Sequence, residues 1–418
     1  MFKEIKKCRV CGNENLTPIL NLGNQTLTGV FPKKDNEFVP SGPLELVKCT
    51  GEMEEDNCGL LQLKHSYNLN LLYGKNYGYR SGLNPTMVKH LESKVNKICK
   101  TININKNDLV VDIGSNDGTL LAAYKNKNIE LAGFDPTGEK FKDFYPKNVK
   151  LISDFFSYKN YSKNFSNKKA KIITSIAMFY DLEDPIKFMR EIKECLHDDG
   201  IWVFEQSYMP SMLKTCSYDT ICQEHLEYYS FHQIEWMTKK VGLEIISVEF
   251  SNINGGSFSV CVGKKKNKSN STEKFKYILK KENELKINQN QPFRNFKKNV
   301  SKHKKNLTAL VNKINIESKL LFGYGASTKG NVILQYCNLT KKQIPYIIEI
   351  NPDKYGSYTP GTNIPIISAE EAFKLKPNFL LVLPWHFKNY IISKENKFLK
   401  NKGKIIFPLP KIEIISKK

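Results

Sequence analysis

The segment from residue 217 to residue 230 carries the side chains best suited to chemistry. It reads Ser-Tyr-Asp-Thr-Ile-Cys-Gln-Glu-His-Leu-Glu-Tyr-Tyr-Ser, and it combines carboxyl, imidazole, thiol and phenol groups at a density that a plain surface loop rarely shows. His225 could act as a general base, with Glu224 or Glu227 adjusting its pKa. The alternative is a structural histidine in a hydrogen-bonded loop, and the segment alone leaves that alternative open.

Four cysteines near the start of the chain have the spacing of a metal site. Cys8 and Cys11 lie in Cys-Arg-Val-Cys-Gly, the usual knuckle of a structural zinc site, in which glycine relieves the turn that points both sulfurs inward. Cys49 and Cys58 form a wider second pair, and the loop between them is long enough to bring both thiolates to one ion. We predict a Zn²⁺ site with four cysteine ligands, which leaves no open position and is therefore structural. Unliganded buried cysteines are the alternative.

A glycine turn follows the buried strand expected at residues 109–113. Gly114 and Gly118 enclose Ser115 and Asn116, and a helix is expected to begin at residue 119. Glycine is needed where φ is positive or where a side chain would block a ligand, and a helix N-terminus suits an anionic group. With Asp112 in the strand, the form D-x-G-x-x-x-G resembles motif I of class I S-adenosylmethionine (SAM) methyltransferases. A plain strand-to-helix turn is the alternative.

Two further segments could complete a SAM site. Asp135 ends the strand expected at 130–135, about 20 residues beyond the glycine turn, where a carboxylate can accept from ribose hydroxyls. Asp135 could also cap the next helix, or serve both purposes. Asp154 and Phe155 lie in the expected third strand, 149–156, from which they could meet adenine by a hydrogen bond and by stacking.

A second glycine turn, Gly-Tyr-Gly-Ala-Ser-Thr-Lys-Gly at residues 323–330, lies between an expected strand and an expected helix. It resembles a phosphate cradle, but no Gly-Lys-[Ser/Thr] ends it, so it is not a Walker loop. The turn could hold the diphosphate of a nucleotide-linked substrate, with Ser327 and Lys329 as ligands. A dinucleotide site with Glu349 on a ribose is the weaker alternative.

The pattern of elements predicts an α/β protein with several parts. Between residues 101 and 263, strands alternate with helices, which favours a parallel sheet with helices on both faces. Its later strands are expected at 171–179 and 201–205, and a final hairpin at 248–250 and 258–262. We divide the chain into a cysteine-containing domain at 1–66, an α/β domain at 67–263, a helical linker at 264–319 and a second α/β unit at 320–418.

The composition limits the possible partners. The net charge is +22, but the only arginines are Arg9, Arg80, Arg190 and Arg294, and the lysines are spread along the whole chain. A reader of nucleic-acid backbones would more often cluster arginine with aromatic residues, so we expect no nucleic-acid partner. No apolar run approaches the roughly 20 residues that span a bilayer, and no signal peptide precedes the first cysteines. We therefore expect a soluble cytoplasmic protein whose oligomeric state the sequence leaves open.

Taken in order, four stretches resemble the SAM-dependent C-methyltransferases that act on nucleotide-linked keto-deoxysugars. The stretches are the four cysteines, the turn at 112–118, the segment at 219–230 and the turn at 323–330. The resemblance covers nearly the whole chain. It implies a class I SAM methyltransferase Rossmann-like domain, flanked by a small N-terminal zinc-binding domain and a C-terminal Rossmann-like α/β domain that helps to hold the nucleotide sugar.

The resemblance also implies a mechanism. A base removes the proton beside a ketone, and the resulting enolate attacks the methyl group of SAM, while a nearby donor stabilises the oxyanion. His225 matches the base of the family, Glu224 its neighbour, and Tyr77 or Tyr79 a tyrosine from the region before the SAM domain. We expect further substrate contacts from Tyr180, Cys222 and Tyr228.

The chain departs from the family at two places. Cys222 and Gln223 stand where many members have tyrosine and then often histidine, and Tyr180-Asp181 stands where sugar C-methylating members often place a histidine. An O- or N-methyltransferase acting on a sugar or polysaccharide precursor is therefore the leading alternative. A zinc-containing nucleic-acid-binding protein and a dehydrogenase using the C-terminal turn are weaker ones.

Overall fold

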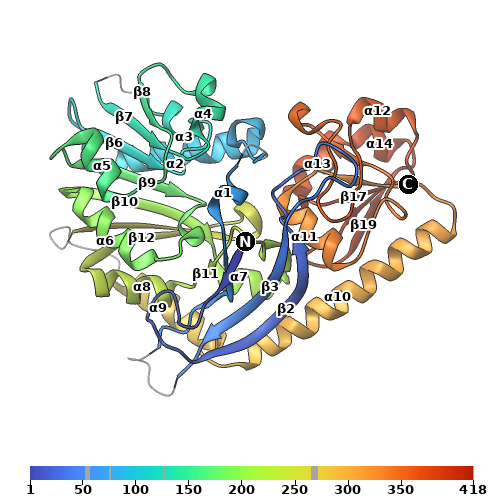
Figure 1. The fold of residues 1–418 in the computed structure, drawn as a ribbon, viewed down its shortest axis with the longest axis horizontal. Helices are drawn as coiled ribbons and strands as arrows, with labels where there is room; N and C mark the ends of the chain where they lie inside the picture. The colour runs from blue at the N-terminus through green and yellow to red at the C-terminus, as the bar shows by residue number, and fades with distance from the viewer. Residues whose placement is uncertain (52–56, 75–76, 126–127, 265–271, 418) are drawn as a thin grey trace.

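The computed structural model describes residues 1–51, 57–74, 77–125, 128–264 and 272–417. Two α/β units stand side by side, with the N-terminal strands between them and the long helix α10 (Gln291–Ile316) along their lower side (Figure 1). Among these described residues, no helix has both the length and the apolar character needed to cross a membrane.

The larger unit is built on a seven-stranded sheet with the order β12-β13-β10-β9-β6-β7-β8. From β10 to β8 the neighbours are parallel, whereas β13 is antiparallel to both β10 and β12. The strands are β6 (Leu109–Ile113), β7 (Glu130–Phe134), β8 (Val149–Ile152), β9 (Ala170–Ile176), β10 (Leu196–Ser207), β12 (Leu243–Ser251) and β13 (Ser257–Lys264). This arrangement confirms the predicted parallel α/β sheet and its final hairpin.

Helices cover both faces of this sheet because its central strands are apolar on both sides. Val110 of β6 packs with residues of α2 and α3, while Leu109 and Val111 pack with residues of α5, α6 and α8. The helices are α2 (Pro85–Thr101), α3 (Thr119–Ala122), α4 (Gly138–Phe141), α5 (Tyr158–Phe165), α6 (Pro185–Cys195) and α8 (Phe231–Val241). The carboxyl ends of the parallel strands are left uncovered by these helices, and ligands bind at that edge in this fold class.

The third strand of the sheet is shorter than predicted. It ends at Ile152, because the side chain of Asp154 turns the chain toward α5. The two carboxylate oxygens of Asp154 accept hydrogen bonds from the Phe155 N–H at 2.7 Å and from the Asn160 amide at 2.9 Å. The predicted strand over 149–156 is therefore wrong in its second half.

The N-terminal unit is an antiparallel sheet with the order β11-β4-β3-β2. Three of its strands, β2 (Leu16–Thr26), β3 (Ser41–Cys49) and β4 (Leu61–Leu63), come from the start of the chain. The fourth, β11 (Glu227–Tyr228), comes from the reactive segment at 217–230, and β1 (Phe2–Glu4) pairs separately with β5 (His65–Tyr67). The N-terminal sheet and the reactive segment therefore form one structure, which the sequence did not predict.

The C-terminal unit has a six-stranded sheet with the order β16-β15-β14-β17-β18-β19, in which only β19 is antiparallel to its neighbour. The strands are β14 (Leu321–Tyr324), β15 (Ile347–Glu349), β16 (Ile366–Ser368), β17 (Phe379–Val382), β18 (Lys404–Phe407) and β19 (Glu413–Ser416). Its helices are α11 (Thr328–Tyr336), α12 (Ala369–Lys374), α13 (Lys388–Lys394) and α14 (Asn396–Lys400). The predicted second α/β unit is present.

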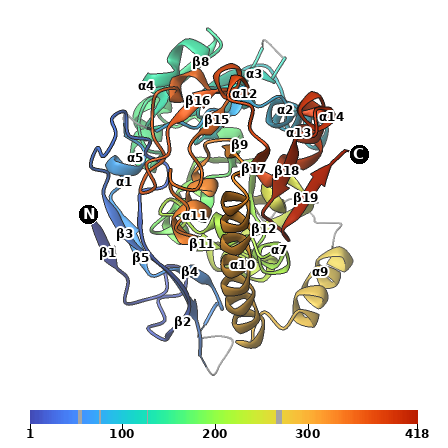
Figure 2. The same cartoon turned by 90° about the vertical axis from the view of Figure 1, so that its right-hand side faces the viewer.

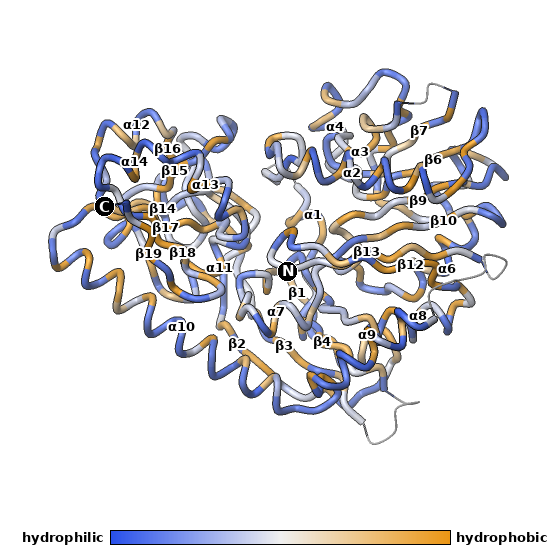
Figure 3. The backbone as a smooth tube through the Cα atoms, turned by 180° about the vertical axis from the view of Figure 1, so that it is seen from behind, coloured by the Kyte–Doolittle hydropathy of each residue, from blue (hydrophilic) through white to orange (hydrophobic). Residues whose placement is uncertain are grey.

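Two helices, α9 (Thr272–Glu284) and α10, connect the two α/β units. Seen from the side, α10 crosses the molecule below the C-terminal sheet, next to the N-terminal strands (Figure 2). Hydrophobic and hydrophilic stretches alternate along it, whereas the strands of the two large sheets are mainly hydrophobic (Figure 3). Phe293, Val300 and Leu307 of α10 are fully or almost fully buried, so this helix belongs to the core and is not only a solvated linker.

One apolar core joins the N-terminal sheet, α7 (Met209–Thr215), α10 and the C-terminal unit, whereas the seven-stranded sheet has separate cores on its two faces. The joining core contains Leu44 of the N-terminal sheet, Met209 of α7, Phe293 of α10 and Leu321 of the C-terminal sheet. Tyr218, from the reactive segment, is buried in the same core. The reactive segment is therefore held by the N-terminal and C-terminal units together.

Candidate active site

A cavity of about 480 Å³ opens between the two α/β units. Its walls come from the glycine turn after β6, the end of β9, the reactive segment and the glycine turn after β14. The predicted site residues that line it are Tyr77, Tyr79, Asp112, Gly114, Ser115, Asn116, Asp135, Phe155, Tyr180, Glu224, His225, Ser327 and Lys329. The volume is typical of a site for one or two small ligands.

The first glycine turn is shaped by residues with positive φ. Gly114 has φ of 73° and Asn116 has φ of 51°. A Cβ atom at Gly114 would lie only 3.0 Å from Cγ of Met178, which is tighter than an ordinary contact, so the turn has no space for a side chain. The backbone itself thus forms the cavity wall, as the D-x-G-x-x-x-G pattern predicts.

Two buried carboxyl groups support this turn from below. The Thr174 hydroxyl donates to Asp112 at 2.6 Å, and burial raises the pKa of Asp112 to about 7. Asp135 accepts from the Asn116 N–H at 2.8 Å and from the Thr137 N–H at 2.7 Å, so it ties the end of β7 to the turn. Asp135 does not cap α4 (Gly138–Phe141), whose N-cap is Thr137; the Asp135 carboxylate holds the turn before that helix, and it also lines the cavity.

Among the other predicted cofactor residues, Phe155 lines the cavity, whereas Asp154 and Gly118 do not. Asp154 is exposed and does not line it, because both of its oxygens are used in the turn toward α5. Gly118, with φ of 75°, also lies outside the lining, where a Cβ atom would meet the Tyr145 ring at 2.9 Å. Its glycine is required by packing and backbone conformation rather than by a ligand.

His225 presents a neutral imidazole to the cavity. Nδ1 lies 2.7 Å from the carbonyl oxygen of Thr220, which can only accept, so Nδ1 carries the proton and Nε2 keeps its lone pair. The ring of Tyr180 packs edge-on against the imidazole at 4.4 Å between centroids. Burial, followed by the positive charge of Lys329, lowers the pKa of His225 to about 3. The side chain is therefore neutral at physiological pH.

Glu224 lies beside His225 in the same wall and is almost fully buried. Its Oε2 has no hydrogen-bond partner among the described residues, and burial raises the pKa of its carboxyl group. A Cβ atom at Gly29 would lie 2.2 Å from Oε1 of Glu224, so the N-terminal unit leaves room for this carboxyl group by having glycine there.

The structure does not bring Cys222 and Tyr228 to the cavity. Cys222 is fully buried in the shared core, and the Tyr228 hydroxyl donates to the carbonyl oxygen of His225 at 3.1 Å. Gln223 is structural as well, since its amide accepts from the Thr28 hydroxyl and donates to the carbonyl oxygen of Gln25, both at 3.0 Å. The predicted substrate contacts of Cys222 and Tyr228 are therefore not supported, because the pairing of β11 with β4 turns this part of the segment inward.

Tyrosines from the region before α2 form the opposite side of the cavity. The Tyr73 hydroxyl donates to Asp181 at 2.9 Å, and the Tyr73 ring lies 5.4 Å from that of Tyr77 and 6.3 Å from that of Phe155. Tyr79 lines the cavity with a half-exposed ring, and its carbonyl oxygen accepts from the Asn116 amide. This cluster connects the first glycine turn with the loop that carries Asp181.

The C-terminal unit contributes its own glycine turn. Ser327 caps α11 by accepting from the Gly330 N–H at 3.0 Å, and Glu349 accepts from the Ala326 N–H at 2.7 Å. Glu349 thus ties the second strand of its sheet to the turn, as Asp135 does in the larger unit. Lys329 lines the cavity, and its amine donates to the carbonyl oxygen of Asn254 at 3.0 Å. Its charge helps to lower the pKa of His225, so the C-terminal unit contributes a cation that acts on the candidate base.

The four predicted zinc ligands converge. The thiol sulfurs of Cys8, Cys11, Cys49 and Cys58 all lie within 4.8 Å of one another, with 3.5 Å between Cys8 and Cys58 and between Cys11 and Cys49. Zn–S bonds of about 2.3 Å in a tetrahedron place sulfurs about 3.8 Å apart. The donor set and its size therefore fit a structural zinc ion.

Sequence reasoning missed two polar groups in the cavity wall. The Gln206 side chain is buried, and neither atom of its amide has a partner among the described residues. The Nδ1 atom of His386 is likewise buried without a described partner, and burial lowers the pKa of this histidine well below its usual value. Gln206 lies at the carboxyl end of β10 and His386 follows β17, so the rule that ligands bind at carboxyl ends could have found them.

Three domain families match the chain along most of its length. A zinc-binding domain matches residues 8–73, a methyltransferase domain matches residues 87–248, and a C-methyltransferase C-terminal domain matches residues 252–410. The C-methyltransferase NovU of Streptomyces niveus is 26% identical over 420 residues, with 100% of this chain and 98% of NovU covered.

Solved structures are similar to part of the chain. An S-adenosylmethionine-dependent methyltransferase from Clostridium acetobutylicum is 14% identical, covers 42% of this chain and 92% of its own, and has a TM-score of 0.33. The plantazolicin methyltransferase BpumL, solved with SAH, is 14% identical, covers 44% of this chain and 86% of its own, and has a TM-score of 0.35.

The methyltransferase domain and the cavity at the carboxyl ends of its strands define the class: this chain is a SAM-dependent methyltransferase with a zinc-binding domain. The matching C-terminal domain and the full-length similarity to NovU make the chain similar to C-methyltransferases.

Proposed function

We propose that this enzyme methylates a carbon atom next to the ketone of a nucleotide-linked sugar. The observation that carries the proposal is the single cavity, which joins the first glycine turn, the imidazole of His225 and the second glycine turn. A methyl donor on one side, a base in the middle and a nucleotide on the other side would occupy these three parts.

The residues of the first turn fit SAM. The turn is free of side chains at Gly114, and the ring of Phe155 lies in the same wall as the carboxyl group of Asp135. When bound, SAM supplies an electrophilic methyl group. Ser115 and Asn116 would hold its amino-acid end, Asp135 would meet the ribose, and Phe155 the adenine.

His225 is the proposed base. Its Nε2 lone pair is available because Nδ1 is bound to Thr220. The C–H bond beside the ketone breaks, its proton goes to Nε2, and its electron pair goes into the enolate. SAM, held at the first glycine turn, would supply the methyl group to the enolate carbon and would leave as S-adenosylhomocysteine. Glu224 and the phenols of Tyr77 and Tyr79, which line the same cavity, are the proposed neighbours of the reacting carbon.

Lys329 is the proposed stabiliser of the oxyanion. A thiol at position 222 cannot act as the donor, since Cys222 does not reach the cavity. The charge of Lys329 acts on His225, and it also acts on Asp219, a buried acid whose pKa is raised by burial and lowered by Lys329. A fixed cation near the developing negative charge favours the enolate over the ketone. This places Lys329 at the reacting end of the sugar, and leaves the turn around Ser327 for the diphosphate.

Isotope exchange tests the proposal. The enzyme is mixed with nucleotide-linked keto sugars in heavy water without SAM, and deuterium incorporation beside the ketone is followed by mass spectrometry. Exchange that depends on enzyme, followed by a gain of one methyl group on carbon when SAM is added, would support the proposal. Methylation of oxygen or nitrogen without prior exchange would instead establish the O- or N-methyltransferase alternative.

A further inference from the structure

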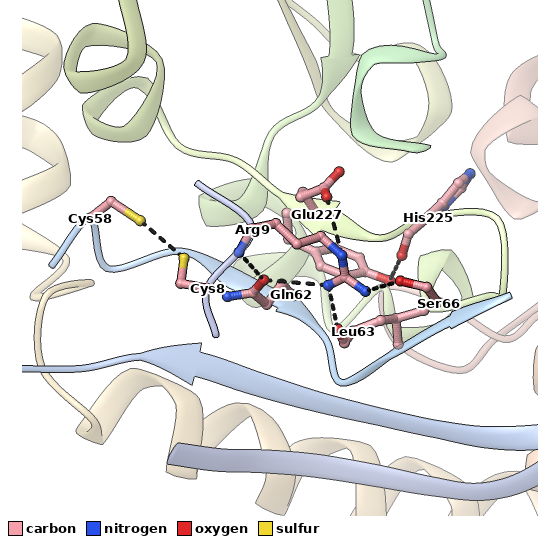
Figure 4. A network of polar contacts seen from close by, with 9 residues as sticks. Cys8, Arg9, Cys58, Gln62, Leu63, Ser66, His225 and Glu227 are labelled. Carbon is pink, nitrogen blue, oxygen red and sulfur yellow. Dashed lines mark hydrogen bonds and ion pairs between the residues drawn. The ribbon is translucent and has the colours of Figure 1, made fainter. Parts of the chain in front are cut away.

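Arg9 connects the cysteine cluster to the segment that carries His225. It stands between the ligands Cys8 and Cys11, yet its side chain points away from them and is almost completely buried (Figure 4). Its backbone N–H donates to the Gln62 side chain at 3.1 Å, and its guanidinium donates to the Ser66 hydroxyl at 2.9 Å. The same guanidinium also donates to the carbonyl oxygen of Leu63.

The guanidinium also faces a buried acid. Arg9 Nε lies 3.7 Å from Oε1 of Glu227, whose side chain is fully buried. Neither oxygen of Glu227 has a hydrogen bond among the described residues; burial raises the pKa of its carboxyl group well above the usual value, and the charge of Arg9 lowers it. The Arg9 guanidinium, which is held by Ser66 and Leu63, lies against this buried carboxyl group, so the position of β11 depends on the position of Arg9.

Glu227 lies two residues after His225, and the short strand β11 fixes the path between them. Glu227 pairs with Gln62 and Tyr228 pairs with Leu61, while the Leu63 N–H donates to the carbonyl oxygen of Leu226 at 2.8 Å. The Tyr228 hydroxyl then holds the carbonyl oxygen of His225 at 3.1 Å. Each of these contacts involves either Arg9 itself or one of the two strands that Arg9 contacts, β4 and β11.

We propose that Arg9 is a positioning residue: it transmits the geometry of the zinc knuckle to the catalytic segment and so fixes where His225 stands in the cavity. The zinc ion then has two effects, stabilising the N-terminal unit and orienting the base. The SAM turn lies on a different sheet, after β6, and does not depend on this linkage. The inference rests on the proposed role of His225, but the position of His225 can be measured separately from its role.

Two substitutions in the full-length, zinc-loaded protein test this linkage. Arg9→Lys keeps the charge but cannot reach Ser66, Leu63 and Glu227 together, because lysine lacks the planar fork. Glu227→Gln replaces the carboxyl group opposite Arg9 by an amide of the same size and leaves the knuckle unchanged. Arg190→Gln, at an exposed position of α6, is the matched control.

Four measurements are made on each variant. Zinc content and SAM affinity by calorimetry are expected to stay within twofold of wild type. The NMR signal of His225, identified in histidine-labelled protein by its loss in His225→Gln, is expected to move in both variants and to stay in place in the control. The kcat for methyl transfer is expected to fall at least tenfold, with a smaller change in KM.

A wild-type His225 signal and wild-type kcat in Glu227→Gln would overturn the proposal, whatever the fate of Arg9→Lys. If Arg9→Lys fails to bind zinc, Glu227→Gln alone decides, because it leaves all four ligands and the knuckle intact. If the wild-type enzyme shows no deuterium exchange, the proposed function fails, but the His225 signal still reports whether Arg9 positions this loop.

Discussion

At the scale of single residues, the site is defined by what surrounds His225. The imidazole is held as one tautomer by Thr220, is kept neutral by burial, and faces a cation from another part of the chain. These features make the lone pair of Nε2 available at all physiological pH values. The nearby acid Glu224 is buried and partly unpaired, and burial raises the pKa of its carboxyl group, so it favours the protonated form more than a surface glutamate does.

Replacing His225 by glutamine should abolish the reaction without disturbing the cofactor site. Loss of a general base lowers a rate by about 10²- to 10⁴-fold, and glutamine preserves most of the volume of the ring. We expect deuterium exchange and methyl transfer to fall by that range, with SAM affinity by calorimetry unchanged. His232→Gln, at an exposed position of α8, is the control and should behave as wild type. Full exchange in His225→Gln would exclude this residue as the base.

Replacing Lys329 by methionine should raise the pKa of His225. The charge of Lys329 is the second cause of the low pKa, after burial, so its removal shifts the pKa upward but not to the usual value. His225 then becomes protonated, and inactive as a base, at a higher pH than in wild type. We expect the acidic limb of the kcat/KM profile to move to higher pH, and the maximal rate to fall because the oxyanion loses its cation. An unchanged acidic limb would show that Lys329 does not act on His225.

At the scale of elements, two glycine turns and one cysteine knuckle organise the molecule. Each glycine turn follows the first strand of a parallel sheet and is tied to the next strand by an acid, Asp135 in one unit and Glu349 in the other. The acid holds the turn open against the sheet edge, where it can receive a ligand. The knuckle acts differently, because it closes on a metal ion and leaves no coordination position for a substrate.

Gly114→Ala should weaken SAM binding. Alanine pays about 1–2 kcal/mol for the left-handed conformation at φ of 73°, and its Cβ atom would lie 3.0 Å from Cγ of Met178. We expect at least a tenfold loss of SAM affinity by calorimetry. Gly356→Ala is the matched control, because φ is 72° and a Cβ atom there meets nothing within 4 Å. Equal SAM affinities in the two variants would show that the first turn does not form the cofactor site.

Removing the zinc ligands should destabilise the protein. In the double variant Cys8→Ser and Cys11→Ser, the two remaining thiols cannot hold a zinc ion tightly, and structural zinc contributes directly to the free energy of folding. We expect loss of bound zinc and a clear decrease in Tm by calorimetry. Cys99→Ser, an exposed cysteine outside the cluster, serves as the control. A wild-type Tm in the double variant would contradict a structural metal site.

At the scale of the whole molecule, the cavity and the core are both shared between units. The cavity needs His225 from one part and Lys329 from another, and the reactive segment is bound on both sides. Toward the N-terminal unit, β11 pairs with β4, and toward the C-terminal unit, the Trp385 indole donates to Asp219 at 2.8 Å. The catalytic geometry is therefore a property of the assembled chain.

A fragment of residues 1–263 should not fold cooperatively. Without the rest of the chain, Leu44, Met209 and Tyr218 would lose the apolar partners supplied by α10 and the C-terminal sheet. We expect a broad thermal transition followed by circular dichroism, together with strong binding of a hydrophobic dye, in contrast to the full-length protein. A monodisperse fragment with a sharp transition would show that the units are independently stable.

Much of the fold could be predicted because strong local patterns carry it. The apolar run at 109–113, the positive-φ glycine that follows it and the Cys-x-x-Cys knuckle each reflect constraints that act within a few residues. The errors arose where contacts between distant segments decide. Asp154 was expected to contact the cofactor but caps a turn, and Cys222 and Tyr228 were expected at the substrate but face the core. No local sequence pattern indicates that residues 227–228 pair with residues 61–62.

By itself, the sequence determined the two strand–turn–helix sites, the metal ligands and the reactive segment, because spacing and side-chain chemistry act locally along the chain. Only the tertiary structure decided which of these features meet. Bringing Lys329 and His225 to one cavity, Arg9 to Glu227 and His386 into the cavity wall requires the N-terminal and C-terminal units to pack together on a shared apolar core. That packing depends on the shape and burial of many residues that are distant in sequence, so no single motif predicts it.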